Sequence, residues 1–215
     1  MGCASLSMAA AMVGVTRVAW AALFLCGVLI LSNSERTGKT TMAALSGKRI
    51  VMIIAPKNFR DEELLEPLEY LRAQGATVVV ASTKKDPAKG MLGKIVRPDI
   101  LIGEIGDVAA WDGVVFVGGS GADIYFQNAV AHSIARAAVE KGKVLGAICI
   151  APATLANAGV LTGKKATAYS SVQTILRNGG AVVAAAQSVV RDGKIVTANG
   201  PAAATEFAHV LAGAF

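Results

Sequence analysis

Three groups in this sequence have the residue types and positions for covalent chemistry, and the first is a lone cysteine. The apolar run 144–148 ends at Cys149, and a helix-forming segment at 152–158 follows almost at once. This order predicts a strand, a sharp turn and a helix, which lifts the cysteine side chain out of the sheet and points helix N–H groups toward it. Because the helix dipole favours a thiolate, we expect Cys149 to be a nucleophile. The alternative is an ordinary buried core cysteine.

The other two groups follow the ends of two further apolar runs. Glu63 lies in the first turn of a predicted helix, and Gly118-Gly119 come directly after a strand-like run. The carboxyl ends of parallel strands meet at one edge of a sheet, so we expect these groups to converge on Cys149. The N–H groups of Gly119 and Ile150 would then stabilise a developing oxyanion. Plainer explanations exist, since an acid suits the first turn of a helix and two glycines suit a tight turn.

Strand and helix patterns alternate along the rest of the chain. Apolar runs predict strands at 50–54, 76–82, 113–117, 143–148, 164–168, 182–186, 188–191 and 194–198. Helical spacing predicts helices at 61–71, 129–141, 152–158, 171–178 and 201–210. Short strands at 94–97 and 99–102 suggest an edge hairpin, and Asp192-Gly193 suggests the turn of another. Buried strands that alternate with helices predict a three-layer α/β/α fold with a mostly parallel sheet.

Composition separates an N-terminal segment from a folded domain. Of the 215 residues, 53% are hydrophobic and 17% are charged, which allows a large core and argues against general disorder. We assign 1–45 to an extension and 46–215 to the domain. The apolar run 18–31 fits a membrane anchor, a signal-peptide core or a start assigned too early. A membrane contact is expected only if 8–32 forms an anchor, and the positive residues after it favour a cytoplasmic domain.

Several classes of function are disfavoured by what the sequence holds. The formal charge of +6 comes from scattered lysines and arginines, without a basic stripe among aromatic residues, so nucleic-acid binding is not expected. Cys3 and Cys26 fall in the extension, which leaves one thiol in the domain and suits a reducing compartment. The two histidines and one domain cysteine are too dispersed for a metal site, and no dinucleotide fingerprint follows a strand. We therefore expect neither a metal nor a cofactor.

From about Lys48 to its end, the chain resembles the PfpI/ThiJ family, a branch of the class I glutamine amidotransferase-like proteins that includes the deglycase linked to Parkinson disease. The motifs that carry the resemblance are Asp61-Glu-Glu63 with Pro67, Phe116-Val-Gly-Gly119, Ala147-Ile-Cys149, Leu155 to Gly163, and Gly200-Pro201 with Glu206-Phe207-Ala208. The resemblance implies a flavodoxin-like α/β/α sandwich with a nucleophile elbow, and a homodimer.

The resemblance also implies roles for individual residues. The reactive cysteine of the family falls on Cys149, and its partner glutamate, usually protonated and hydrogen-bonded to the sulfur, falls on Glu63. A protonated carboxyl that donates to sulfur would stabilise the thiolate. Asp123 falls where the peptidase branch places an acid that acts across a subunit interface. Taken alone, Asp123 is an ordinary loop or cap residue.

The sequence departs from the family where a histidine base is expected. Ile150 replaces the histidine that follows the cysteine in the peptidase branch, and Tyr169 replaces the nearby histidine of the deglycase and glyoxalase branch. Ala151 replaces the usual glycine after the elbow. His132 and His209 fall within predicted helices elsewhere, which gives them no expected part in catalysis. A cysteine–histidine dyad, and amide hydrolysis with it, is therefore doubtful.

Three kinds of function remain open from the sequence. The first is an enzyme in which Cys149 adds to a reactive carbonyl compound or its adduct, Glu63 moves the proton, and Tyr169 supplies a polar group; a cysteine peptidase or amidase is the runner-up. The second is a stress or redox protein whose thiol is oxidised. The third, weaker option is a subunit that uses its surface for assembly.

Overall fold

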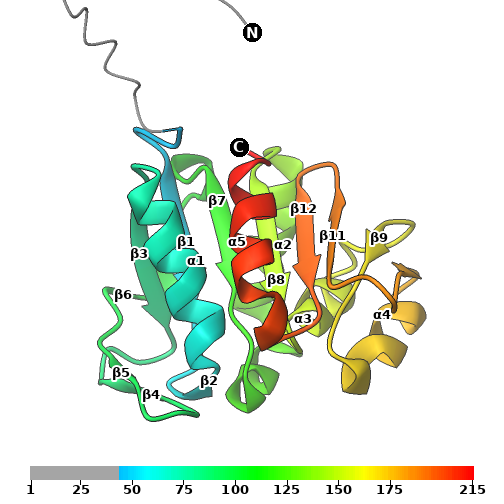
Figure 1. Ribbon diagram of the computed structural model, residues 1–215, viewed down its shortest axis with the longest axis horizontal. Coiled ribbons are helices and arrows are strands. Elements are labelled where there is room, and N and C mark those ends of the chain that lie inside the picture. The colour runs from blue at the N-terminus through cyan, green and yellow to red at the C-terminus, as the bar shows by residue number, and fades with distance from the viewer. Residues whose placement is uncertain (1–43) are drawn as a thin grey trace, which may run out of the picture. The chain divides into compact units, whose positions relative to one another are not determined.

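The computed structural model describes residues 44–215, so the predicted apolar run 18–31 and the first two cysteines lie outside the described residues. Over the described range, none of the helices has the length and apolar character needed to cross a membrane. Seven strands form one sheet in the order β11-β12-β8-β7-β1-β3-β6 (Figure 1). Their bounds are β1 Arg49–Ile53, β3 Thr77–Ser82, β6 Ile100–Leu101, β7 Gly113–Phe116, β8 Val144–Ile148, β11 Val189–Asp192 and β12 Ile195–Ala198.

The sheet is mostly parallel, as the apolar runs predict. Every neighbouring pair is parallel except β11 with β12, which form an antiparallel hairpin around the predicted turn at Asp192-Gly193. The arrowheads of β3, β7 and β12 point to the same edge in Figure 1. From β1 the chain runs outward to β3 and β6, then returns to the other side of β1 as β7, β8 and β12. That reversal of direction is where open α/β sheets form ligand crevices, at the carboxyl ends of the strands.

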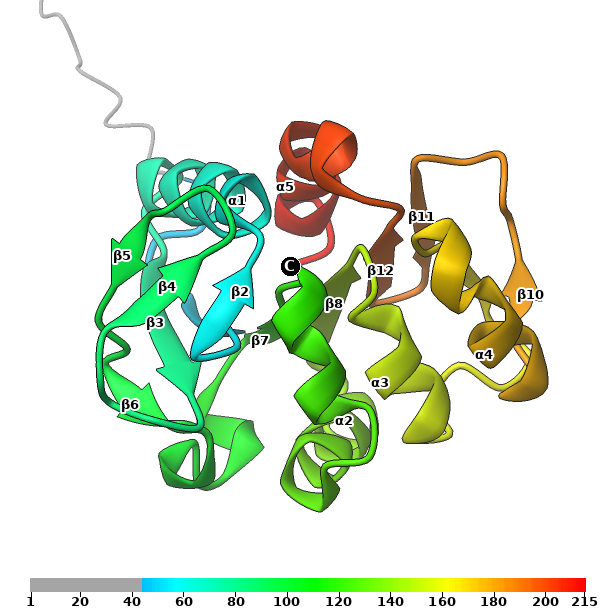
Figure 2. The ribbon, with the colours of Figure 1, turned by 90° about the horizontal axis from the view of Figure 1, so that it is seen from below.

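Helices cover both faces of the sheet and complete three layers (Figure 2). On one face α1 (Asp61–Ala73) packs beside α5 (Ala204–Ala212). The other face carries α2 (Ala129–Glu140) and α3 (Pro152–Asn157), and α4 (Gln173–Asn178) packs against α3. The α/β/α sandwich predicted from the sequence is therefore confirmed.

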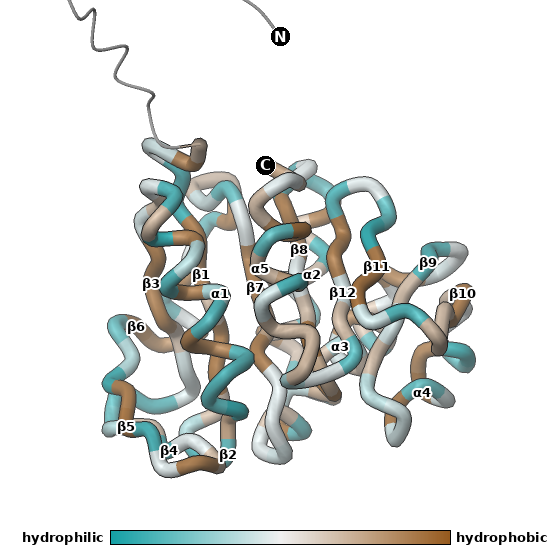
Figure 3. Tube along the Cα trace, in the orientation of Figure 1, coloured by the Kyte–Doolittle hydropathy of each residue, from teal (hydrophilic) through white to brown (hydrophobic). Residues whose placement is uncertain are grey.

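Strand β1 shows why runs that are apolar on both faces belong in this sheet. Successive side chains of a strand point to opposite faces. Val51 and Ile53 join the core under α2 and α3, whereas Ile50 and Met52 join the core under α1 and α5, and all four are fully buried. Figure 3 shows the same pattern as hydrophobic central strands beneath helices with hydrophilic stretches.

The predicted hairpin at 94–97 and 99–102 is wrong. Instead, β5 (Ile95–Val96) pairs antiparallel with β4 (Ala88–Gly90), and β6 pairs in parallel with β3. Asp99 causes the separation, because its carboxylate accepts from the Val80 N–H at 2.7 Å and its own N–H donates to the Val80 carbonyl at 2.8 Å. These two bonds fix the segment after Pro98 alongside β3 rather than alongside β5.

Other segments differ from the sequence prediction in length or place. The segments 164–168 and 182–186 contribute only β9 (Lys165–Ala166) and β10 (Val182–Val183), which pair outside the main sheet. The sequence did not predict β2 (Lys57–Phe59), which joins β4 and β5 in a small sheet. The 3-10 helices are η1 Ile102–Glu104, η2 Val108–Ala110, η3 Ser120–Tyr125, η4 Ser170–Val172 and η5 Pro201–Ala203.

Asp61 ties the small sheet to the start of α1. Its buried carboxylate accepts two backbone hydrogen bonds of 2.8 Å, from the N–H groups of Leu92 and Lys94 in the β4–β5 loop. Negative charge in the first turn of a helix is also favourable. The carboxylate therefore fixes the position of a loop that begins with Met91.

We expect Asp61→Asn to destabilise the protein by about 1–3 kcal/mol, because an amide group can accept only one of the two bonds and leaves a buried N–H unpaired. Urea unfolding would measure the change. Asp86→Asn, at an exposed loop position, is the control and should change stability by less than about 0.5 kcal/mol. Equal effects of the two variants would contradict the role given to Asp61.

Candidate active site

Cys149 occupies the sharp turn that the sequence predicts between β8 and α3. Its φ angle is +64°, a left-handed conformation that is uncommon for any residue except glycine. Two hydrogen bonds support this backbone: the Cys149 N–H donates to the Ala198 carbonyl at 2.9 Å, and the Tyr169 N–H donates to the Cys149 carbonyl at 2.8 Å. Residues held this way by their surroundings are typical of functional sites.

The glycine pair lies directly against the cysteine, because β7 and β8 are neighbours in the sheet. A Cβ atom on Gly118 would lie 2.5 Å from the Cys149 Cβ and 2.5 Å from the Glu63 Oε2. Gly119 has a φ of +96°, and a side chain there would collide with the backbone of Arg60. Gly118 is required because neighbouring side chains approach its backbone closely. Gly119 is required for the same reason and also because its φ angle is positive.

Glu63 is a fully buried carboxyl that lacks a conventional partner. It projects from the first turn of α1, and that turn is fixed to the glycine pair by a 3.0 Å hydrogen bond from the Arg60 N–H to the Gly118 carbonyl. Neither Glu63 carboxyl oxygen makes a hydrogen bond of ordinary geometry with any described residue. The Cys149 thiol and the Gly118 N–H nonetheless lie close enough to lower its pKa. Buried polar groups without a well-formed hydrogen bond are uncommon in native proteins, so this carboxyl calls for a functional explanation.

Burial dominates the acidity of this carboxyl. Loss of water raises the pKa of Glu63 to about 7, although the nearby thiol, the Arg60 guanidinium and the Gly118 N–H each oppose the change. A carboxyl with such a pKa is matched to proton transfer at neutral pH. Groups perturbed in this way are common in active sites.

Burial raises the pKa of Glu63 in the direction that the resemblance implies, but it also raises the pKa of the Cys149 thiol, which opposes the expected thiolate. The pKa of Cys149 is raised to about 12, first by burial and then by the negative charge of ionised Glu63. The N–H groups of Gly119 and Ile150 lower it, but they do not outweigh the other two causes. At neutral pH the cysteine is therefore held as a thiol, and Glu63 is divided between the carboxyl form and a carboxylate that can accept the thiol proton.

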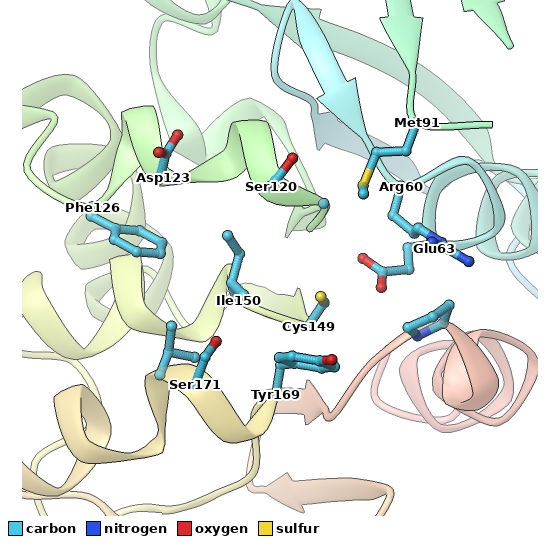
Figure 4. A pocket seen from close by; sticks show the side chains of 13 residues that line it. Arg60, Glu63, Met91, Ser120, Asp123, Phe126, Cys149, Ile150, Tyr169 and Ser171 are labelled. Carbon is cyan, nitrogen blue, oxygen red and sulfur yellow. The ribbon is translucent and has the colours of Figure 1, made fainter. Parts of the chain in front are cut away.

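A cavity of about 470 Å³ opens above the sulfur. Figure 4 shows the Cys149 and Glu63 side chains facing each other on one side of it, with the Tyr169 ring beside the sulfur. Its lining residues are Arg60, Glu63, Met91, Gly119, Ser120, Asp123, Phe126, Cys149, Ile150, Tyr169, Ser171, Val172 and Pro201. The cavity therefore brings together the residues predicted from the ends of separate strands.

Asp123 and Tyr169, predicted as auxiliary residues, also line the cavity. Both are exposed, and Asp123 lies toward the side of the cavity away from Glu63 (Figure 4). Neither histidine lines it: His132 contacts the Phe126 carbonyl at 2.9 Å, and His209 packs against the Tyr70 ring. The expectation that no histidine lies beside the thiol therefore holds for the described residues.

Sequence reasoning missed several cavity residues. Arg60 is one, and its place just before the Asp61-Glu-Glu63 motif was a signal that could have found it. Its guanidinium forms two hydrogen bonds of 2.8 and 2.9 Å with the Glu62 carboxylate. Met91 had no such signal, because it reaches the cavity on the β4–β5 loop.

Within the described range, no cluster of three or more residues could hold a metal ion.

We expect Gly118→Ala to change the alkylation rate of Cys149 and to slow any turnover that depends on the Cys149–Glu63 pair. The added methyl group would push apart the Cys149 and Glu63 side chains and would lie 2.7 Å from the Ile148 carbonyl oxygen. Overpacking of this kind costs about 1–3 kcal/mol of stability. Gly103→Ala is the control, because nothing lies within 4 Å of its added Cβ. Iodoacetamide labelling and thermal unfolding would compare the two variants, and equal behaviour would contradict the role of Gly118.

The buried carboxyl also predicts how stability depends on pH. The folded pKa of Glu63, about 7, lies above its ordinary value of 4.5, so its stabilising contribution is full below pH 4.5 and is lost as the pH rises through 7. One pKa unit corresponds to about 1.4 kcal/mol, which makes the total roughly 3 kcal/mol. Wild type should lose this much relative to Glu63→Gln between pH 4.5 and 8 in urea titrations. Parallel curves for the two proteins would show that Glu63 does not ionise in its buried position.

Comparison with known proteins finds relatives that match most of this chain. An uncharacterised protein of Methanocaldococcus jannaschii is 38% identical over 184 residues, which cover 83% of this chain and 86% of the relative. A protein named as a deglycase from Thermococcus kodakarensis is 34% identical over 70% of this chain and 90% of its own. A Caenorhabditis elegans protein named as a glutathione-independent glyoxalase is 24% identical over 75% of this chain and 85% of its own.

Solved structures and a family model agree with these relatives. The crystal structure of a ThiJ/PfpI domain protein from Brachyspira murdochii superposes with a TM-score of 0.75 at 32% identity, covering 78% of this chain and 97% of that one. The model of the DJ-1/PfpI family matches residues 48–213, which include the cysteine, the glutamate and the glycine pair. On this evidence of sequence, fold and site, the chain belongs to the DJ-1/PfpI family.

Proposed function

We propose that this protein is a cysteine-dependent enzyme that converts small 2-oxoaldehydes, or their adducts, to 2-hydroxy acids. The observation that carries the proposal is the pairing of a thiol on a left-handed turn with a buried carboxyl whose pKa is about 7. Relatives named as deglycases and as a glyoxalase support the same class of substrate. The family alone leaves the reaction open, so the argument rests on what the cavity can do chemically.

In the first step the Cys149 sulfur attacks the aldehyde carbon while the Glu63 carboxylate takes the thiol proton. A new S–C bond forms, the aldehyde oxygen receives that proton from Glu63, and a hemithioacetal results. The N–H groups of Gly119 and Ile150 lie close enough to the sulfur to lower the pKa of the thiol, and in this proposal they stabilise the oxyanion as it develops. General-base assistance compensates for the raised pKa of the thiol.

In the following steps the carboxylate, free again, moves the hydrogen of the first carbon as a proton to the second carbon, and the hydroxyl proton of the hemithioacetal passes to the second carbonyl oxygen. The first carbon is oxidised to a thioester and the neighbouring ketone is reduced to an alcohol, so no external oxidant or reductant is consumed. Water then cleaves the S–C bond, releases the 2-hydroxy acid and restores the thiol. Tyr169 lies beside the sulfur in Figure 4 and would hydrogen-bond the second carbonyl oxygen.

The residues of the site and the raised pKa of its thiol argue against a peptidase or amidase and against a redox sensor. Amide hydrolysis requires a general acid for the leaving amine, and Ile150 occupies the position where the peptidase branch has histidine. Oxidation of a sensor cysteine proceeds through the thiolate, which the raised pKa of Cys149 disfavours. Carbonyl addition with Glu63 as the base requires neither a histidine nor a resting thiolate.

The test is turnover of methylglyoxal by the full-length protein, followed as aldehyde loss and lactate formation. We expect kcat/KM to rise with pH around a midpoint of about 7, because the base must be ionised. Glu63→Gln should lower kcat/KM by on the order of 10²- to 10⁴-fold and remove this pH dependence. Cys149→Ser should abolish lactate formation.

Two controls separate catalysis from folding. Glu69→Gln changes an exposed carboxyl on α1 and should leave the rate unchanged. Circular dichroism would show whether each variant keeps its secondary structure. Lactate formation that persists in Cys149→Ser would overturn the proposal.

A further inference from the structure

The cavity is much larger than a molecule such as methylglyoxal requires. Its volume of about 470 Å³ falls within the range of roughly 300–1,000 Å³ that holds drug-sized ligands. Methylglyoxal carries only a methyl group next to its two carbonyls and would leave most of this space to water. The lining beyond the sulfur therefore indicates what else the substrate carries.

Three apolar side chains line the cavity on the side away from Glu63, and we call them the apolar arm: Phe126, Ile150 and Val172. These residues come from three segments, which are the end of η3, the turn after β8 and the end of η4. Figure 4 shows Ile150 between the Cys149 sulfur and the Phe126 ring. Val172 is buried, whereas Phe126 and Ile150 keep part of their surface exposed. An apolar ligand that displaces water from these half-exposed side chains would bind with a favourable free energy, because apolar surface leaves water.

The polar groups lie at the other end of the cavity and fix the orientation of a substrate. The Glu63 carboxyl and the N–H groups of Gly119 and Ile150 surround the sulfur, so the dicarbonyl end belongs there. A substituent on the second carbon would then extend over the Ile150 side chain toward Phe126. The reacting end is thus polar, and the arm offers an apolar surface between Asp123 and Ser171, which suits a molecule with a polar head and an apolar substituent.

The charges around the cavity disfavour an acidic substituent. Arg60 is the cation of the lining, and its guanidinium already pairs with the Glu62 carboxylate. Asp123 and Glu63 add negative charge to the same cavity, so a carboxylate on the substrate would meet repulsion without a free cation among the lining residues. A neutral substituent fits the apolar arm and these charges together.

We propose that the preferred substrates are 2-oxoaldehydes with a bulky, neutral, apolar substituent such as an aryl group, which packs in the apolar arm. This inference rests on the proposed function and narrows its substrate class. Apolar pockets of this kind discriminate by roughly 10- to 200-fold for each group that they bury. Phenylglyoxal is the probe, and the arm should give it a kcat/KM at least about tenfold above that of methylglyoxal.

Truncation of the arm tests the assignment independently of the intrinsic reactivity of the two aldehydes. Phe126→Ala should reduce the phenylglyoxal-to-methylglyoxal ratio of kcat/KM by about tenfold. The Phe126 backbone should stay in place, because its carbonyl accepts from Asn157 Nδ2 at 2.8 Å and contacts His132 Nε2 at 2.9 Å. Val172→Ala should act in the same direction. Ile124→Ala is the matched control, since this exposed residue of η3 does not line the cavity, and it should leave the ratio unchanged.

Initial rates with the full-length protein, measured as mandelate and lactate formation, give outcomes that can be told apart. A ratio of at least about tenfold that falls in both arm variants and not in Ile124→Ala supports the inference. If lactate forms in a Cys149-dependent reaction but the ratio does not respond to Phe126→Ala or Val172→Ala, the inference is overturned and the proposed function stands. If neither acid forms, the proposed function fails, and the inference fails with it.

Discussion

A carboxyl without exposed surface lies beside a thiol at the end of the inner strand β8, and the rest of the site depends on this pair. Burial makes the charge of Glu63 costly, and the same cost moves its pKa toward 7. A more exposed carboxyl would be a weaker base, and a fully apolar neighbour would leave the thiol without any base. Burial of Glu63 therefore lowers the free energy of unfolding at neutral pH and, at the same time, gives the site a carboxyl that can transfer protons at that pH.

The sheet provides the rigidity that this pair needs. Cys149 follows β8, and Gly118 follows the adjacent β7, so two neighbouring strand ends fix the sulfur and the glycine pair within one hydrogen-bonded frame. Glu63 arrives on α1, whose first turn is bonded to the Gly118 carbonyl through the Arg60 N–H. Glycine is required between the two side chains because a single methyl group would fill the space that they share. The thiol, the carboxyl and the glycine pair thus constrain one another's positions.

The sequence predicted the sheet, its helices and the convergence of the reactive groups, because long apolar runs and parallel strand ends leave few alternatives. It failed where short polar segments depend on distant partners. The position of β6 depends on the contacts of Asp99 with Val80, and Met91 reaches the cavity only because Asp61 fixes its loop. The sequence also did not predict the raised pKa of the Cys149 thiol. A helix start near Cys149 is visible in the sequence, whereas the degree of burial of Glu63 appears only in three dimensions.

Glu63 and Cys149 come from distant parts of the chain, and Gly118, which separates them, comes from a third. A newly synthesised fragment that ends before Cys149 lacks the pair, and so does a molecule whose inner strands β7 and β8 have separated. A chain that has not completed its sheet therefore carries an ordinary cysteine with an ordinary, solvated glutamate. The chemistry of this thiol is a property of the finished fold, and its reaction rate with an alkylating reagent serves as a direct readout of how much of a sample is native.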